Sequence, residues 1–487
     1  MDIHITLGDR GDLAARIYRQ LLDAILDGRL RVGERLPPTR VLASQLAVSR
    51  NTVAVAYERL GAEGYLTGQV GAGTYVSAPS GVVRRARVAS GRSATDQPAA
   101  TAAQPRRLWA SLPLAATAPA LTPQFDFSVG VPDRMLFPFE TWRRLIGREL
   151  RPAAIGSVDY ADPGGHPGLR AAIARHFAVS RAVQASAADV LITHGAQQAL
   201  DLIGRVLVEP GSCVAVEEPG YPPARHLFQS LGARVVGVPV DDSGIVVDEL
   251  PRSARLVYVT PSHQFPLGTA MSLTRRTALL EWAQRHGAVI IEDDYDSEFR
   301  FSERPLEPLQ SIDRSGRVIY VGTFSKTLLP LLRLGFLIAP PSLLPALRTA
   351  RQLTDWHSDT VSQATLARFI DEGLLARHIR RAARHYAARH QQVVSWLRDE
   401  VGDLLALVPS TAGLHVCARV AQGASVDVDA AVRHSRAVGV SVRSLAPYYA
   451  ETPGLPGLVI GYGAIPADRI AAGIAHLTFA LRQSSPA

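Results

Sequence analysis

Between residues 125 and 487, short apolar runs rich in β-branched residues alternate with segments of helical periodicity. This alternation is typical of an α/β domain, because a helix that connects two parallel strands covers the sheet that they form. A chain of 487 residues exceeds what one hydrophobic core usually spans, so we expect two or three domains. Residues 1–78 are predicted to form a compact, mainly helical domain. Residues 79–124, rich in Ala, Pro, Ser and Thr, are predicted to form a flexible linker.

The sequence excludes several classes of protein. It has no run of about eighteen uncharged apolar residues and no basic-then-apolar leader, so neither a membrane span nor secretion is expected. Cys213 and Cys417 are its only cysteines and lie far apart, which excludes a disulfide framework and a cysteine-only zinc site. We therefore expect a cytoplasmic protein that does not contact a membrane.

The net charge of +8 permits a nucleic-acid partner without requiring one. The excess of positive charge is not in the first domain, which carries nine arginines against eight acidic residues. It lies in the linker, where six arginines face a single acidic residue, Asp96. A solvated linker without a binding role and a linker that grips phosphates both remain open interpretations.

The first domain shows the pattern of a helix-turn-helix. Leu13, Ile17, Leu21 and Ile25 form one apolar stripe of a helix over 13–27. A short helix follows at 41–46, and a residue suited to capping precedes a third helix that extends to about residue 63. Residues 65–67 and 74–76 are predicted to pair as strands around a glycine-containing turn, which would form a wing. A bare three-helix bundle is the alternative, and helix spacing alone does not exclude it.

Two motifs in the α/β region point to a ligand with a phosphate and a planar ring. At 191–199 a strand runs into a glycine turn and a helix start, where free backbone amides suit a phosphate. A glycine kept only for turn geometry is the alternative. At 217–222 a strand ends close to Tyr221, whose ring can stack on a planar ligand or simply pack in the core.

A third motif delivers acidic residues to the end of the apolar strand at 289–296. Such a cluster can hold a metal ion, but no histidine or further acid at ligand spacing supports one, and we expect no metal. A buried aspartate facing a pyridine nitrogen would keep that nitrogen protonated, because opposite charges a few ångströms apart favour the ionised pair. The ring would then act as an electron sink.

The fourth motif contains Lys326, the only lysine in the chain; the other 51 of the 52 basic residues are arginines. A lysine amine forms a Schiff base with an aldehyde, whereas a guanidinium stays protonated and does not. Chance retention of one lysine is the alternative. Thr323, Ser325 and Arg333 lie close in sequence and can bind a phosphate beside an aldehyde bonded to Lys326.

These segments resemble two known families. The string GERLPPTRVLASQLAVSRNTVAVAYERLGAEGYLTGQVGAGTYV resembles the winged helix of the GntR family. The motifs HGAQQAL, EEPGYP, TPSHQFPLG, EDDYDSEFR and GTFSKTLLPLLRLGF resemble fold-type I aminotransferases, and the whole chain resembles the MocR-type subfamily of GntR regulators. The resemblance implies a winged helix-turn-helix followed by an aminotransferase-like domain at 125–487. That domain would have a parallel-rich α/β large part and a smaller α+β part, and it would bind pyridoxal 5′-phosphate.

The resemblance also assigns roles to residues at the matching positions. Lys326 would form the internal aldimine, Asp293 would pair with the pyridine nitrogen, and Tyr295 would reach the phenolic oxygen. Tyr221 would stack on the ring. Gln264 is our choice for the asparagine that aminotransferases place before their Pro-x-Gly turn. The phosphate would be held by the start of a helix and by polar side chains: Gly195, Ala196, Gln197, Thr323, Ser325 and Arg333.

By the same resemblance the winged helix binds double-stranded operator DNA and the protein is a homodimer. The resemblance leaves open whether each head lies over its partner's large domain. The effector would be pyridoxal phosphate itself or an amino compound that bonds to it. The residues expected to contact DNA come from the helix-turn-helix and the wing: Arg40, Ser49, Arg50, Thr52, Gly71 and Gly73.

One departure from the aminotransferase pattern bears on function. Val459 stands where many aminotransferases carry an arginine that clamps the substrate carboxylate, although Arg443 or Arg225 could substitute. Without the clamp an amino acid loses orientation and turnover suffers, which favours a sensor over a metabolic enzyme. An active aminotransferase with an added DNA-binding domain and a cofactor-free dimerisation scaffold are the alternatives. His415 and the His- and Arg-rich helix around 377–390 are interpreted as structural or surface features.

Overall fold

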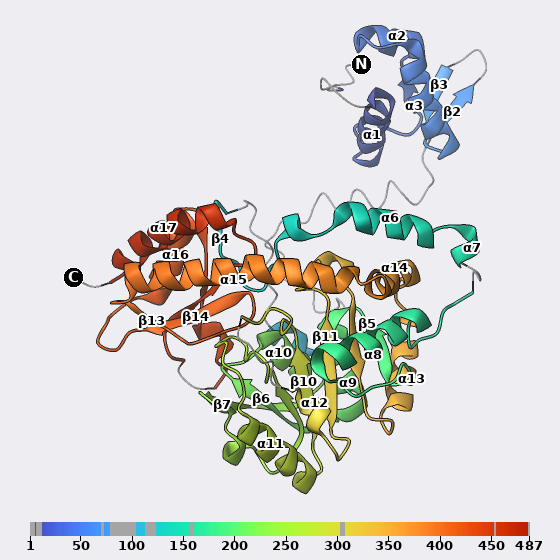
Figure 1. Ribbon diagram of the computed structural model, residues 1–487. Coiled ribbons are helices and arrows are strands. Elements are labelled where there is room, and N and C mark those ends of the chain that lie inside the picture. The colour runs from blue at the N-terminus through green and yellow to red at the C-terminus, as the bar shows by residue number, and fades with distance from the viewer. Residues whose placement is uncertain are drawn as a thin grey trace. The chain divides into compact units, whose positions relative to one another are not determined.

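The computed structural model divides into two compact units, Met1–Pro105 and Arg106–Ala487, which are described separately (Figure 1). The predictions for Gly71 and for most of the linker lie outside the described part of the chain. The described residues are 5, 12–69, 73–77, 104–112, 123–155, 159–301, 307–451 and 454–485.

Within residues 12–69 and 73–77 the first unit has three helices and a small antiparallel sheet, which confirms the winged helix-turn-helix and excludes the bare bundle. Ile17, Leu21, Val53 and Leu60 meet in its core, so the stripe expected from the sequence is the buried face. The strands pair in the order β1-β3-β2. The elements are α1 (Leu13–Leu26), β1 (Arg35–Leu36), α2 (Thr39–Gln45), α3 (Arg50–Ala62), β2 (Leu66–Gln69) and β3 (Gly73–Val76).

The second unit is built around an eight-stranded sheet in the order β5-β12-β11-β10-β9-β6-β7-β8. Its central pairs are parallel, whereas β12 runs antiparallel to both of its neighbours, β11 and β5. The strands are β5 (Val190–Thr193), β6 (Cys213–Glu218), β7 (Arg234–Asp241), β8 (Gly244–Ile245), β9 (Ala254–Val259), β10 (Val289–Asp294), β11 (Val318–Thr323) and β12 (Gly335–Ile338).

Helices cover both faces of this sheet, as Figure 1 shows, and side chains of each strand alternate between the two layers. Leu256 and Ile291 pack under the layer that contains α9, whereas Val257 and Ile290 pack against α11. The helices that flank the sheet or follow it are α8 (Pro167–Arg181), α9 (Gly195–Leu207), α10 (Pro222–Ser230), α11 (Leu273–His286), α12 (Leu309–Ile312), α13 (Leu344–Asp355) and α14 (Thr360–Asp371).

A smaller α+β part is formed by the C-terminal segments together with residues from just after the linker. An antiparallel sheet in the order β13-β14-β17-β16 shares one hydrophobic core with α15, α16 and α17. A short parallel pair joins β4 to β15. The elements are β4 (Phe125–Asp126), α15 (Leu374–Val401), β13 (Leu405–Leu407), β14 (His415–Val420), α16 (Val428–Ala437), β15 (Val440–Ser441), β16 (Arg443–Ser444), β17 (Gly457–Gly461) and α17 (Ile470–Arg482).

Three further helices lie near the start of the second unit: α5 (Arg107–Ser111), α6 (Phe139–Glu149) and α7 (Pro152–Ile155). The first of them falls within the segment that we predicted as linker, so at least this part of 79–124 has secondary structure. Among the described helices, none is both long and apolar enough to cross a membrane. The arrangement of the second unit is the fold predicted for 125–487.

Candidate functional site

The only lysine lies just after β11, at the edge where the parallel strands end. Its Nζ donates a hydrogen bond to the carbonyl oxygen of Gly130, 2.7 Å away. Burial lowers the pKa of the Lys326 amine, although the negative charges of Asp296 and Asp293 act in the opposite direction. A lysine whose pKa is lowered is more often neutral, and the neutral amine is the form that attacks an aldehyde.

Asp293, near the end of β10, has one oxygen satisfied and one not. Its Oδ2 accepts a hydrogen bond of 2.7 Å from the Tyr258 hydroxyl, while Oδ1 is buried without a hydrogen-bond partner among the described residues. Burial raises the pKa of Asp293 to about 7. A buried acceptor left without a donor is costly, and a protonated ring nitrogen would supply both the donor and a compensating charge. This carboxylate therefore fits a pyridinium ring.

The neighbouring acids of the same strand have structural partners. Glu292 accepts hydrogen bonds from the backbone amides of Leu309 and Gln310 at the start of α12. Asp294 forms a buried ion pair of 2.9 Å with Arg181. Burial works against the charged form of Asp294, but the guanidinium holds its pKa below the ordinary value. Oδ1 of Asp294 also has no hydrogen-bond partner among the described residues, but its carboxylate is already paired with a guanidinium. Among the three acids of β10, Asp293 is thus the one whose unsatisfied oxygen belongs to a carboxylate without an arginine partner.

The start of α9 forms a cradle for an anion. Gly195 is the first residue of α9 and has a φ of +74°, and no side chain caps this helix end. A Cβ at Gly195 would lie 3.2 Å from the guanidinium of Arg333, which donates to the carbonyl oxygen of His194 at 2.7 Å. Free helix amides beside a guanidinium suit a phosphate. Ala196 and Gln197 follow as the next residues of the helix.

The antiparallel direction of β12 explains why these groups meet. Because β12 runs against β11 and β5, its first residue lies at the edge where its two neighbours end. Arg333, just before β12, is thereby brought beside the start of α9, and Lys326 lies on the same connection between β11 and β12. Thr323 and Ser325 are buried at this edge with their hydroxyls 3.0 Å apart.

Tyr221 follows β6 and Gln264 follows β9. In the strand order they therefore lie on the other side of Lys326 from Arg333. The ring of Tyr221 meets the edge of the Phe265 ring at a centroid distance of 5.5 Å. The side-chain amide of Gln264 donates to the carbonyl oxygens of Pro219 and Phe265, each at 2.8 Å, so in this structure it fixes the loop between two strands. Direct contact of Gln264 with a cofactor stays a prediction.

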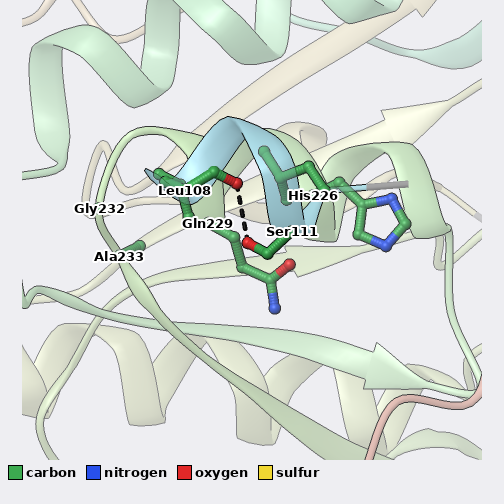
Figure 2. A pocket seen from close by; sticks show the side chains of 7 residues that line it. Leu108, Ser111, His226, Gln229, Gly232 and Ala233 are labelled. Atoms are coloured by element: carbon green, nitrogen blue, oxygen red, sulfur yellow. Dashed lines mark hydrogen bonds between the residues drawn. The ribbon is translucent and has the colours of Figure 1, made fainter. Parts of the chain in front are cut away.

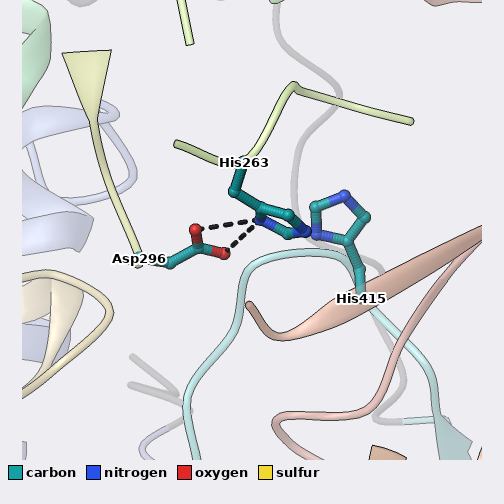
Figure 3. A group of neighbouring side chains, drawn as sticks. All are labelled: His263, Asp296 and His415. Atoms are coloured by element: carbon teal, nitrogen blue, oxygen red, sulfur yellow. Dashed lines mark hydrogen bonds and ion pairs between the residues drawn. The ribbon is translucent and has the colours of Figure 1, made fainter. Parts of the chain in front are cut away.

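Sequence reasoning found no histidine near the acidic motif, yet the structure places two there (Figure 3). His263 lies with its Nδ1 3.0 Å from Asp296, and the ring of His415 is 4.9 Å from that of His263. Ligand atoms of these three side chains lie within 4.8 Å of one another, a spacing that a metal site requires. Each already has a protein partner, since His415 Nε2 bonds to the carbonyl oxygen of Pro266. Hydrogen bonds within the protein therefore account for this cluster.

Tyr295, which the sequence predicted, contacts His263 in the same cluster. Gly130 and Tyr258 are two further residues of the site that sequence reasoning missed. Gly130 is far from every motif in sequence and leaves no signal. Tyr258 is a hydroxyl-bearing residue within the apolar strand β9, beside β10, and knowledge of that strand pairing would have pointed to it.

The residue at the expected position of the carboxylate clamp is apolar, and so are its surroundings. Val459 is fully buried in a cluster with Leu267 and Tyr448. Arg443 lies opposite Val459 on β16 and is exposed, and Arg225 donates from α10 to the backbone oxygen of residue 447. Substitution of either arginine for the missing clamp stays a prediction.

The helix-turn-helix presents its candidate DNA contacts on the surface. Arg40 on α2 and Arg50 at the start of α3 are exposed. The hydroxyl of Ser49 accepts a hydrogen bond from the backbone amide of Thr52 and lies 2.8 Å from the Thr52 hydroxyl. In the wing, a Cβ at Gly73 would lie 2.7 Å from Nε of the Arg35 side chain, which sequence reasoning did not single out.

A separate hollow of about 560 Å³ lies in the second unit between α5 and α10 (Figure 2). Leu108 and Leu112 contribute apolar surface, and His226 and Gln229 contribute polar groups from α10. It shares no lining residue with the site around Lys326.

Two family models match this chain. Residues 13–76 match the gntR family of bacterial regulatory proteins, and residues 122–440 match aminotransferase class I and II. The probable rhizopine catabolism regulatory protein MocR of Rhizobium meliloti is 39% identical over 467 residues, covering 95% of this chain and 92% of that protein. The pyridoxine biosynthesis transcriptional regulator PdxR of Corynebacterium glutamicum is 31% identical and covers 96% of each chain.

Solved structures of aminotransferases share the fold of the second unit. Pyrococcus horikoshii kynurenine aminotransferase has a TM-score of 0.70 at 27% identity, covering 76% of this chain and 93% of that one. LysN, the alpha-aminoadipate aminotransferase of Thermus thermophilus solved with N-(5′-phosphopyridoxyl)-L-leucine, has a TM-score of 0.68 at 31% identity, covering 74% and 92%.

Proposed function

The chain belongs to the MocR-type subfamily of GntR-family transcriptional regulators, and from this premise we propose that it is a regulator that senses an amine through bound pyridoxal phosphate. The winged helix binds operator DNA. Lys326 holds the cofactor as an aldimine, and the cofactor itself or an amino compound is the effector. We further propose a cytoplasmic homodimer, as the resemblance implies.

One observation carries this proposal: a half-buried lysine with a lowered pKa lies near a buried aspartate that has an unsatisfied oxygen. When bound, the cofactor supplies an aldehyde that bonds reversibly to amines and a ring that accepts electrons. Lys326 offers the neutral amine for that bond. Asp293 holds a proton on the ring nitrogen, and the start of α9 with Arg333 holds the phosphate.

The contact of Lys326 with Gly130 supports the sensing step. Gly130 lies close to the start of the described segment 123–155, at the end of the linker. The same segment contains β4, which pairs with β15. A bond between Lys326 and the cofactor would engage the same Nζ that donates to Gly130 in this structure, and an amine that displaced Lys326 would release it again. Amine binding thus changes a contact in the segment that connects this unit to the linker.

The visible absorption spectrum of the purified full-length protein tests the proposal. A visible band that borohydride abolishes, and that Lys326→Ala lacks, is the expected result. Because Lys326 is the only lysine, cofactor fixed by borohydride must map to a single side chain by peptide mass analysis. A colourless protein that takes up no added cofactor would leave only DNA binding and dimerisation to this chain.

An active aminotransferase is the second candidate. The presence of Asp293 and Tyr295 together with Lys326 favours it. The apolar surroundings of Val459 oppose it, since they provide no carboxylate clamp on β17. Sustained turnover with an amino donor and a 2-oxo acid would establish this alternative. If the protein instead reacts once with an amine, does not turn over, and then binds operator DNA with a changed affinity, the result would support the sensor.

A further inference from the structure

His263 is held between two side chains that follow β10. Its Nδ1 lies 3.0 and 3.1 Å from the two carboxylate oxygens of Asp296 and 2.9 Å from the hydroxyl oxygen of Tyr295. His263 and Asp296 are only 2% and 1% exposed. Because an ionised carboxylate only accepts hydrogen bonds, Nδ1 carries the hydrogen, which it shares between the carboxylate and the phenol oxygen.

The imidazole ring has no freedom to turn away from this arrangement. On its other side Nε2 lies 3.2 Å from the hydroxyl of Ser410. The backbone of Gly413 closes over the pair, because a Cβ there would lie 2.1 Å from the His263 ring and 2.5 Å from Asp296. Packing and hydrogen bonds therefore fix the direction in which Nδ1 points.

The phenol of Tyr295 has a choice of acceptors that the ring does not have. Its hydroxyl donates to the backbone oxygen of His263 at 2.9 Å, while its oxygen accepts from Nδ1 of the same residue. A hydroxyl hydrogen rotates freely, so it can turn from this carbonyl to a ligand oxygen. A phenol whose oxygen accepts a hydrogen bond is a stronger donor through its own hydrogen.

We propose that His263 and Asp296 are positioning residues: they orient and polarise the Tyr295 hydroxyl so that it donates to the phenolic oxygen of the cofactor. Asp296 fixes the ring, the ring donates to Tyr295, and Tyr295 donates to the cofactor. This inference rests on the proposed function, because it concerns the same bound cofactor. It adds two residues for which neither the motifs nor the spacing indicated a role.

Other titratable groups face the pair and act on it directly. His415 on β14 packs against the His263 ring, and His390 on α15 lies close enough for their charges to interact. The charge of Asp296 acts on Lys326 and on Tyr462 without passing through Tyr295. A substitution of Asp296 would mix these direct effects with the positioning effect, so the test uses His263.

The test follows the pH at which the visible band of the bound cofactor changes in the full-length protein. Donation from Tyr295 stabilises negative charge on the ring oxygen, which weakens the hold of the conjugated nitrogen on its proton. Tyr295→Phe should therefore raise the midpoint by about one pH unit, the equivalent of one hydrogen bond. His263→Phe, which keeps a ring without nitrogens, should raise it in the same direction. His263→Asn, whose amide replaces Nδ1, should restore most of the wild-type midpoint.

The double variant separates positioning from general disturbance. Since His263 acts through Tyr295, adding His263→Phe to Tyr295→Phe should produce no further shift. An additive shift would overturn the proposal, as would a wild-type midpoint in His263→Phe. His286→Leu is the control, because His286 bonds only within α11 and should leave the midpoint unchanged.

If His263→Phe does not fold, His263→Gln replaces it, since its amide lies near the Nε2 position. A raised midpoint in His263→Gln with a normal one in His263→Asn supports the proposal, and equal midpoints overturn it. A colourless wild-type protein overturns both this inference and the proposed function. A coloured protein whose midpoint ignores His263 overturns this inference alone.

Discussion

Each unit of this chain starts a helix where we expect a phosphate to bind, and the two helix ends are built differently. At α3 the hydroxyl of Ser49 accepts from the amide of Thr52, so a side chain of the protein itself caps the end. At α9 no side chain caps Gly195, and its amides stay available to a ligand. The end of α3 is exposed, whereas Gly195 is buried.

The proposed function accounts for this difference. DNA presents many phosphates along a surface, and side chains such as Arg50 reach them while the helix remains capped and stable. A single phosphate on a small cofactor enters a buried cradle, where backbone amides hold it without a mobile side chain.

The largest expected effect is on the pH dependence of stability, and it comes from the burial of Asp293 in the second unit. The pKa of Asp293 is raised to about 7 in the folded, cofactor-free protein, so the folded state keeps a proton that the unfolded state loses above about pH 4. Stability should therefore fall as pH rises from about 4 to about 7. Asp293→Asn should reduce the slope of the unfolding free energy against pH by about 1.4 kcal/mol per pH unit. Urea unfolding of the second unit in the full-length protein, repeated across this pH range, measures the slope.

The control for this prediction is Asp242→Asn at an exposed position, which should keep the wild-type slope. Glu217 and Glu292 also have pKa values raised by burial to about 7, so part of the slope persists in Asp293→Asn. Identical slopes in wild type and Asp293→Asn would show that Asp293 titrates in the ordinary range and would weaken its role toward the ring nitrogen.

The next effect tests the uncapped end directly. Gly195→Ala puts a Cβ 3.2 Å from Arg333 at a positive φ and should weaken cofactor binding at least about 100-fold, measured by absorbance titration. Gly287→Ala is a matched control, since Gly287 has a φ of +67° with nothing within 4 Å of the added Cβ. Both variants should lose similar stability from backbone strain. Equal cofactor affinities in the two would place the phosphate elsewhere.

The capped end should depend on side chains instead. Arg50→Ala should weaken operator binding by about 10- to 30-fold and lower its salt dependence, because a cationic contact is lost. Arg19→Ala, at an exposed position on α1, is the control. Fluorescence anisotropy with labelled operator measures both. An Arg50→Ala protein with a normal footprint would remove α3 from the interface.

The smallest effect concerns the cap itself. Ser49→Ala and Asp12→Ala each remove a side-chain cap, from α3 and from α1, and each should cost the first unit about 1 kcal/mol of stability. Thermal unfolding measures this loss. Only Ser49→Ala should also weaken operator binding, and by a few-fold. If both variants weakened it equally, Ser49 would act through stability alone.

The sequence was sufficient to predict the α/β class, which follows from a local pattern. It also predicted the winged helix and the grouping of Lys326 with Asp293, through the resemblance of their motifs to known families. It did not predict the contacts that depend on distant segments. Gly130 reaches Lys326 across nearly two hundred residues of chain, and His263 meets Asp296 only through the loops after β9 and β10. Short-range periodicity carries no information about such meetings, because strand order and loop paths decide them.

The antiparallel strand β12 has a consequence for how this protein tolerates change in length. Surface connections usually accept insertions at little cost. The connection from β11 to β12 carries both Lys326 and Arg333, so the proposed covalent and ionic attachment points of the cofactor share a single span of fixed length. Adding or deleting one residue between them would leave each group intact and still misalign the pair. Homologous regulators that have kept the cofactor should therefore vary in almost every other loop before they vary in this one.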